Sequence, residues 1–221
     1  MPYNMSVELE GVGFLIVIGI TGGSGSGKGV CTDFFRGKGA AVFDADARYH
    51  QMTNHPSDCT AAIARHFGKV VLQADGALDR KKLSELVMGT SKANEEKRRA
   101  LNRISHAYLS DACLEQLRAW KSIGVTMAVV DAPLLFEADW QKFCDVTIAV
   151  LAPVALRLAR IMERDGISRE QAETRLLSQP PDSFYRDRAD FVVQNDDSRD
   201  KVFSALTLFL NHLSEIYEAR K

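Results

Sequence analysis

Short hydrophobic runs alternate along this chain with longer stretches of helical spacing. The runs that predict strands most clearly span 14–20, 41–43, 125–130, 146–150 and 191–193. Strands that are buried on both faces of a parallel sheet are hydrophobic throughout, and these runs have that character. Because strands that alternate with helices are typical of βαβ units, the pattern predicts an α/β fold around a parallel sheet.

Three stretches predict helices beyond those that a simple sheet requires. The interval 47–124 contains no clear strand, although a crossover needs only about a dozen residues, so we expect an inserted helical subdomain. A second helical interval, 155–185, is interrupted by Pro180 and Pro181. The stretch 201–219 predicts a helix that covers the sheet, because its hydrophobic residues share one helical face. These residues are Val202, Leu206, Phe209, Leu213, Ile216 and Tyr217.

Composition and charge narrow the class of protein. Of 221 residues, 46% are hydrophobic and 26% charged, which is typical of a globular protein and excludes a disordered or collagen-like chain. The net charge is −1, so no overall field attracts nucleic acid or an anionic membrane, and a negatively charged ligand must be held by a local site. The run 14–20 is shorter than the roughly 20 residues of a membrane span, and 1–13 lacks the basic residues of a signal peptide. We therefore expect a cytoplasmic protein.

The four cysteines carry no metal-binding spacing. They are far apart in the sequence, and no C-x-x-C pair or neighbouring pair of histidines accompanies them. We interpret them as reduced thiols rather than as a zinc site. They are Cys31, Cys59, Cys113 and Cys144.

A glycine-rich loop follows the first predicted strand. Residues 22–28 have the pattern G-x-x-x-x-G-K, and a helical pattern begins directly after them. Glycines let successive backbone N–H groups turn toward phosphate oxygens, and the N-terminus of the next helix adds positive potential. This is the phosphate-binding loop of nucleotide-binding proteins, in which Lys28 would contact the β- and γ-phosphates.

One position departs from that loop. The lysine is normally followed by Ser or Thr, whose hydroxyl binds Mg²⁺, but here Gly29 and Val30 follow it. We expect one of two outcomes: Mg²⁺ is held through water and a carboxylate, or the protein uses Mg²⁺ inefficiently. Thr32, one helical turn further on, is a weak substitute.

Carboxylates follow two of the predicted strands. Asp44 and Asp46 come after the second strand, at the sheet edge where ligands of open α/β sheets bind. We expect one of them to cap the next helix and the other to accept the proton of a substrate hydroxyl. Asp131 ends the third strand, and both a water-mediated Mg²⁺ contact and a structural turn stay open for it.

The region 155–188 contains seven arginines and no lysine, together with six acidic residues. A solvent-exposed helix face explains any single arginine as well as phosphate recognition does. The preference for arginine favours phosphate recognition for the set, because a guanidinium can bind two phosphate oxygens at once.

Together these residues resemble the dephospho-CoA kinases. The family's T-G-G-x-G-S-G-K motif is matched at 21–28, D-A-D at 44–46 and P-L-L-F-E at 133–137. Further matches are H-F-G, D-G, L-D-R, R-D-G and R-A-D at 66–68, 75–76, 78–80, 164–166 and 188–190. The resemblance implies a three-layer P-loop NTPase fold with an inserted substrate domain and a lid. The core would span 14–46, 125–156 and 189–221, the CoA-binding helical insert 47–124, and the arginine-bearing lid 157–188.

The resemblance also implies the reaction and the site. The expected reaction transfers a phosphoryl group from ATP, with Mg²⁺, to the ribose 3′-hydroxyl of dephospho-CoA, and no nucleic acid or membrane takes part. Asp46 would be the general base, assisted by Lys28 and Arg160. The expected contacts to dephospho-CoA are Asp44, His106, Pro133 and Leu135, although Ala107 replaces the proline that follows this histidine in the family. The expected contacts to ATP are Gly23, Ser24, Gly25, Ser26, Gly27, Lys28, Gly29, Val30, Arg164 and Asn195.

Two other functions stay open. A Lys-Gly pair also occurs in the loop of nucleoside-monophosphate kinases, so a nucleotide acceptor is the main alternative. A third hypothesis is a nucleotide-binding protein that lost catalysis with the hydroxyl missing at Gly29.

Overall fold

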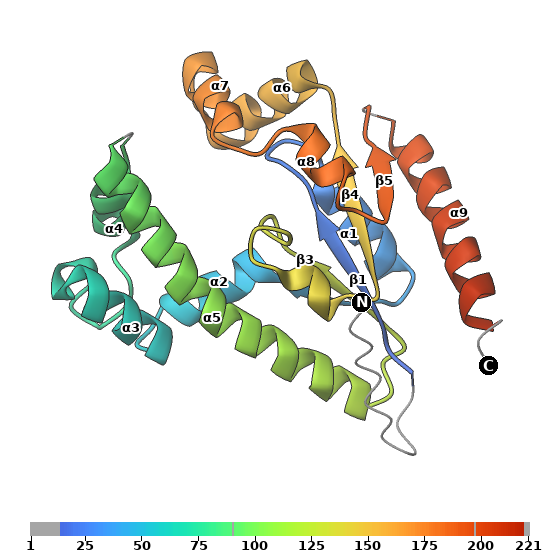
Figure 1. Ribbon diagram of the computed structural model, residues 1–221, viewed down its shortest axis with the longest axis horizontal. Helices are drawn as coiled ribbons and strands as arrows, with labels where there is room; N and C mark the ends of the chain where they lie inside the picture. Colours follow the sequence, from blue (N-terminus) through green and yellow to red (C-terminus); the bar gives the residue numbers. More distant parts are fainter. Residues whose placement is uncertain (1–13, 90, 197, 219–221) are drawn as a thin grey trace. The chain divides into compact units, whose positions relative to one another are not determined.

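The computed structural model describes residues 14–89, 91–196 and 198–218, with side chains as far as residue 213. A five-stranded sheet has the order β2-β3-β1-β4-β5, and β1 runs parallel to β3 and β4, as β4 does to β5 (Figure 1). The predicted α/β class with a parallel sheet is therefore confirmed. The strands are β1 (Ile16–Thr21), β2 (Ala41–Asp44), β3 (Met127–Asp131), β4 (Val146–Leu151) and β5 (Phe191–Gln194).

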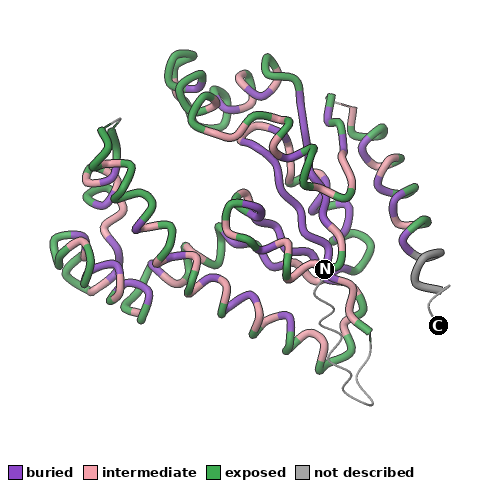
Figure 2. The backbone as a smooth tube through the Cα atoms, viewed as in Figure 1, coloured by how far each residue is buried: buried purple, intermediate pink, exposed green. Residues whose placement is uncertain are grey.

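The inner strands β1, β3 and β4 are almost entirely buried, as their composition predicts (Figure 2). The edge strands β2 and β5 are only partly buried. The helices α1 (Lys28–Gly37) and α9 (Arg199–Glu218) pack on the sheet and on each other. Val202, Leu206, Phe209 and Leu213 are buried, which confirms the predicted covering helix. The side chains of Ile216 and Tyr217, and all of Ala219, lie outside the described residues.

Helices α6 (Val154–Asp165), α7 (Arg169–Leu177) and α8 (Asp182–Arg186) correspond to the second helical interval. They follow β4 and gather at the end of the sheet where β4 finishes (Figure 1). Gly166, with φ of 64°, ends α6, and Ser168 begins α7 with a capping box. Pro181 precedes α8, so the two prolines separate α7 from α8 as expected.

Residues Asp44–Arg118 form a compact unit of their own, and the other unit comprises the sheet together with α1 and α6 to α9. The interval 47–124 is helical as predicted, with α2 (Ala45–Thr53), α3 (Asp58–Phe67), the short 3₁₀ helix η1 (Lys69–Val71), α4 (Arg80–Val87) and α5 (Lys92–Ser122). The helical unit has its own hydrophobic core, which includes Ile63, Val71, Leu78 and Leu83. The predicted lid belongs to the same compact unit as the sheet.

The motifs at 66–68, 75–76 and 78–80 lie at the ends of α3 and α4 and in the turn between η1 and α4. Gly68, with φ of 88°, follows α3 in a conformation that favours glycine. The Asp75 carboxylate accepts a hydrogen bond from the Ala77 amide at 3.0 Å within a turn. The Asp79 carboxylate caps α4 by accepting from the Lys82 amide at 3.1 Å. These motif residues stabilise the local backbone.

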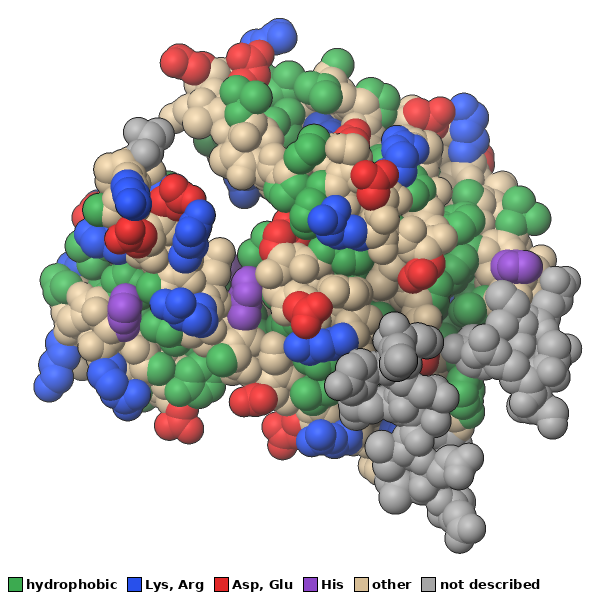
Figure 3. All heavy atoms as spheres, viewed as in Figure 1, with side chains coloured by type: hydrophobic (Ala, Val, Ile, Leu, Met, Phe, Trp, Pro, Cys, Tyr) green, Lys and Arg blue, Asp and Glu red, His purple; other side chains and the backbone are tan. Residues whose placement is uncertain are grey.

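Acidic and basic side chains are interspersed over the face seen in Figure 3. No helix within the described ranges is long and apolar enough to span a bilayer. Burial raises the pKa of the Cys31 and Cys113 thiols to about 12. None of the four cysteines, all of which lie in the described ranges, forms a disulfide.

Candidate active site

The glycine-rich loop joins β1 to α1, as predicted from the sequence. Gly25 and Gly27 have φ of 76° and 82°, a left-handed conformation that glycine adopts without a steric penalty. Helix α1 begins at Lys28, so the loop leads directly into a helix N-terminus. The first N–H groups of a helix have no partners within the helix, which makes this end of α1 suitable for an anion.

Close packing is a second reason why these loop positions are occupied by glycine. A Cβ atom at Gly23 would overlap Nη2 of Arg157, and one at Gly25 would lie 2.6 Å from the carbonyl oxygen of Arg157. A Cβ at Gly27 would overlap Nδ2 of Asn195. Because these glycines have no side chain, α6 and the residue after β5 can pack directly against the loop backbone.

Lys28, the first residue of α1, and Asp131, the last residue of β3, come together. The Lys28 ammonium forms an ion pair with Asp131 Oδ1. The Thr32 hydroxyl donates a hydrogen bond of 2.7 Å to Asp131 Oδ2. Asp131 and Thr32 are 7% and 4% exposed, so this carboxylate is held at both oxygens in a nearly buried position.

The surroundings of Lys28 fit a magnesium ion that keeps most of its water. A Cβ at Gly29 would meet no heavy atom within 4 Å, and the Ser26 hydroxyl is buried without a hydrogen-bond partner in the described part of the chain. No three His, Cys, Asp or Glu side chains among the described residues form a cage for a metal. Mg²⁺ is typically bound by one or two carboxylates, waters and substrate phosphates, a set to which Asp131 is suited.

Arg160 and Asn195 both contact the loop backbone. The Arg160 guanidinium donates to the carbonyl oxygens of Gly25 and Ser26, at 3.2 and 3.4 Å, and to Asn195 Oδ1 at 3.4 Å. The Asn195 side-chain amide donates to the Ser26 carbonyl at 2.9 Å, and its backbone N–H donates to Leu151. Asn195 is 3% exposed, so in this structure it links the end of β5 to the loop.

Arg164 lies at the end of α6 and forms an ion pair with Asp165 at 2.8 Å. Asp165 also binds Arg175 on α7 at 2.6 Å. These arginines hold the pKa of the Asp165 carboxyl below its usual value, chiefly through the hydrogen bond from Arg164. The ATP contact predicted for Arg164 stays a prediction.

Sequence reasoning missed the role of Arg157. A solvent-exposed helix face was one interpretation of each arginine, but Arg157 is only 6% exposed and contacts Ser24, Gln179 and Asp182. A signal was present in the sequence, because Arg157 lies one helical turn before the buried Ile161. The exposed-face interpretation is therefore wrong for this residue.

The two aspartates after β2 differ in role. Asp44 caps α2, since its carboxylate accepts from the Ala47 amide at 2.9 Å, which confirms the expected cap. Asp46 lies exposed in the first turn of α2. His106 is half-buried on α5, and burial lowers its pKa.

The segment after β3 holds the other two predicted substrate contacts. The Pro133 carbonyl accepts a hydrogen bond of 3.1 Å from the Thr21 hydroxyl. Leu135 is fully buried, and its methyl carbon lies 3.0 Å from where a Cβ of Gly19 would be. Leu135 therefore packs against β1. Its contact with a substrate stays a prediction.

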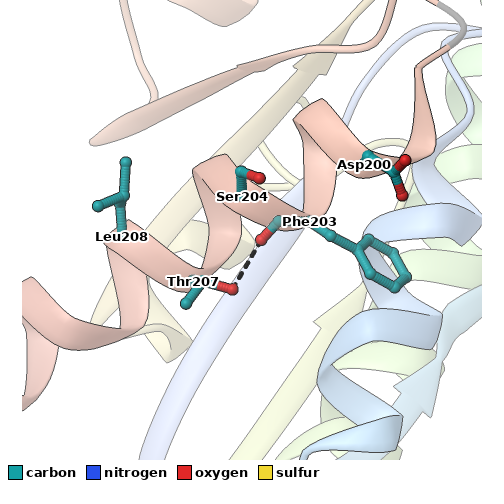
Figure 4. Close-up of a pocket in the computed structure, with 5 residues that line it drawn as sticks. All are labelled: Asp200, Phe203, Ser204, Thr207 and Leu208. Atoms are coloured by element: carbon teal, nitrogen blue, oxygen red, sulfur yellow. Dashed lines mark hydrogen bonds between the residues drawn. The ribbon is translucent and has the colours of Figure 1, made fainter.

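A shallow pocket on α9 offers no comparable chemistry. All of its lining residues come from this one helix (Figure 4). The Thr207 hydroxyl donates to the Phe203 carbonyl one turn earlier in the same helix, so this hydrogen bond is local to α9. Phe203 packs against Phe34 with ring centroids 5.1 Å apart. The pocket contains neither a lysine nor an arginine for phosphate.

Comparisons with known proteins agree with this geometry. The family model for dephospho-CoA kinase matches residues 16–201. A dephospho-CoA kinase of Arabidopsis thaliana is 35% identical over 185 residues, 83% of this chain and 78% of the plant protein. One of Anaeromyxobacter dehalogenans is 38% identical over 179 residues, 81% of this chain and 83% of the relative. The crystal structure of TT1252 from Thermus thermophilus matches with a TM-score of 0.74 at 32% identity, over 90% of this chain and 98% of that protein. The chain therefore belongs to the dephospho-CoA kinase family and is a P-loop kinase.

Proposed function

We propose that this chain transfers the γ-phosphoryl group of ATP to the ribose 3′-hydroxyl of dephospho-CoA, which yields CoA and ADP. The observation that carries the proposal is the loop at 22–28, which leads into the N-terminus of α1 with Lys28 and Asp131 beside it. Family membership indicates the acceptor. The partners are small molecules rather than nucleic acid or a membrane, and the site of action is the cytoplasm.

Phosphoryl transfer depends mainly on positioning and on neutralising charge, because its transition state is loose. In this proposal the loop amides and Lys28 neutralise the phosphates, and Arg160 adds a positive charge beside the loop. Asp46 accepts the proton of the 3′-hydroxyl as the hydroxyl oxygen attacks phosphorus. The capping role of Asp44 supports this assignment, because its carboxylate already binds the α2 backbone.

The residues that would hold Mg²⁺ are Asp131, through water, and Thr32, which orients that carboxylate. When bound, Mg²⁺ supplies positive charge to the phosphate oxygens. The open space at Gly29 is suited to a water in the place of the usual hydroxyl.

The decisive experiment measures ADP release from ATP and Mg²⁺ with dephospho-CoA, AMP or CMP as the acceptor. We expect release that depends on dephospho-CoA, with CoA identified by mass spectrometry. Release with AMP or CMP alone contradicts the proposal and favours a nucleoside-monophosphate kinase, for which the Lys28-Gly29 pair is the supporting observation. Binding of ATP without turnover on any acceptor favours the non-catalytic hypothesis.

A further inference from the structure

Arg157 is an almost fully buried cation whose donors reach three separate acceptors. Its Nε donates to the carbonyl oxygen of Ser24 at 2.9 Å, in the phosphate-binding loop. Its Nη2 donates to Gln179 Oε1 at 3.0 Å, and its Nη1 to Asp182 Oδ1 at 3.1 Å. A buried guanidinium is tolerated only when its charge and its N–H groups are paired, and here Asp182 supplies the charge.

Gln179 shares the same loop residue with Arg157. Its Oε1 accepts from the backbone N–H of Ser24 at 2.9 Å in addition to the Arg157 bond. The residue lies after α7 and just before the two prolines that precede α8. Both polar atoms of the Ser24 backbone are therefore bound by side chains, one from α6 and one from the connection between α7 and α8.

The loop is shaped to accept this contact. Gly23 lacks the Cβ that would overlap the Arg157 guanidinium, and Gly25 lacks the Cβ that would lie 2.6 Å from the Arg157 carbonyl. Glycines on both sides of Ser24 thus let Arg157 approach the loop backbone directly. This packing explains the glycine at 23, where the backbone conformation does not itself require one.

We propose that Arg157 and Gln179 are positioning residues that hold the phosphate-binding loop and couple it to the segment 165–186, which contains α7 and α8. Hydrogen bonds at Ser24 join the loop to this segment, so the orientation of the loop peptides depends on where the segment lies. A ligand that orders the loop therefore also orders α7 and α8, and by linkage the reverse holds. Each of the three guanidinium nitrogens of Arg157 donates to a protein acceptor, so the inference assigns Arg157 to support of the loop and leaves phosphate contact to other groups.

The inference rests on the proposed function only in that the loop binds nucleotide phosphates. ADP is therefore the probe, because its binding needs no acceptor substrate. Calorimetry measures its affinity, and hydrogen exchange measures the protection of amides in α7 and α8 with and without ADP. In the wild type we expect ADP to slow exchange in both the loop and the segment 165–186.

Gln179→Leu removes the shared acceptor with little change in volume. We expect ADP affinity to fall by about tenfold, because an N–H of Ser24 and one of Arg157 lose their partner. We also expect ADP to stop protecting α7 and α8 while it still protects the loop. The matched control is Gln73→Leu in the helical unit, whose side-chain amide donates to the Leu78 carbonyl at 3.2 Å, five residues away. That control should keep both the affinity and the protection.

Two further variants separate coupling from folding. Gln179→Glu keeps an acceptor for both donors, so ADP should still protect α7 and α8 even though the added negative charge weakens ADP binding. If Gln179→Leu does not fold, Arg157→Lys replaces it, since an ammonium cannot make the three divergent bonds of a guanidinium. Undiminished protection of α7 and α8 in the folded Leu or Lys variant overturns the inference, whereas a wild type that binds no ADP overturns the proposed function instead.

Discussion

The phosphate-binding loop and the helical unit 44–118 use their polar residues in different ways. In the helical unit, Ser57 and Thr60 cap α3 through partners three residues apart. In the loop, Ser24 is bound by Arg157, 133 residues away, and Ser26 by Asn195, 169 residues away. The polar residues of the two regions therefore have different physical tasks: one set ends helices, and the other set assembles a loop from distant segments.

The largest expected effect comes from the proposed base. Asp46→Asn keeps the shape of the side chain but removes its basicity, so we expect the rate of phosphoryl transfer to fall by roughly two to four orders of magnitude. ATP affinity, measured by calorimetry, should stay nearly unchanged. Asp58→Asn is the matched control, because Asp58 lies in the first turn of α3 as Asp46 does in α2. Full activity of Asp46→Asn would remove this residue from the base role.

A second prediction concerns the pairing of Thr32 with Asp131. Thr32→Val leaves Asp131 Oδ2 without its donor, and we expect the Mg²⁺ concentration for half-maximal rate to rise by about tenfold. The Mg²⁺ dependence of ADP binding gives a readout that is independent of turnover. Gly29→Ser should act in the opposite direction, since the position has room for a hydroxyl that can bind the metal.

The control for that prediction is another buried threonine of the same unit. The Thr147 hydroxyl donates to Asp190 at 2.6 Å, away from Lys28. Thr147→Val should lower the stability of the fold without changing the dependence on Mg²⁺. An equal change in Mg²⁺ dependence for both threonine variants would show that the effect of Thr32 is only structural.

The two capping boxes test whether the loss of a local contact destabilises only the helix that it caps. Ser57→Ala in the helical unit and Ser168→Ala before α7 each remove a cap, and each should lower the free energy of unfolding by about 1 kcal/mol. Hydrogen exchange should rise in α3 for the first variant and in α7 for the second. Only Ser168→Ala should also weaken ADP binding, because α7 leads into Gln179. Faster exchange throughout both units in either variant contradicts this division.

The smallest effect is a pH dependence of the helical unit. Burial lowers the pKa of His106 in the folded chain, so the unfolded chain binds the proton more readily. The resulting stability is present above the unfolded pKa of about 6.5 and is lost as the pH falls below it. Denaturant unfolding at pH 7.5 and 5.5 should show a smaller loss on acidification for His106→Gln than for the wild type. Equal losses would assign the acid sensitivity to other groups.

Sequence reasoning predicted the fold in detail where the signal lies within a short stretch of the chain. All five strands appear within two residues of their expected bounds, because each strand is a largely continuous hydrophobic run. The loop at 22–28 was recognisable because its glycines and Lys28 lie together in the chain. The sequence left open which of Asp44 and Asp46 caps the next helix, and the hydrogen bond from the Ala47 amide assigns the cap to Asp44.

Other parts of the site depend on contacts that no periodic pattern encodes. Thr32 was considered a weak substitute for the missing hydroxyl, yet it lies directly against Asp131, a residue 99 positions away. Asn195, expected to contact ATP, contacts the loop backbone in this structure. Gln179 received no role from the sequence, although its side chain accepts a hydrogen bond from the Ser24 amide.

The sequence by itself determined the α/β sheet, the position of the phosphate-binding loop and the ends of the helices. These features depend on hydrophobic periodicity and on partners a few residues apart, and both can be recognised in a linear chain. Only the tertiary structure decided that Arg157 is buried and which acceptors it binds. A guanidinium leaves water only where distant segments supply several acceptors at once, and that supply depends on how α6, the loop and the α7–α8 connection pack together.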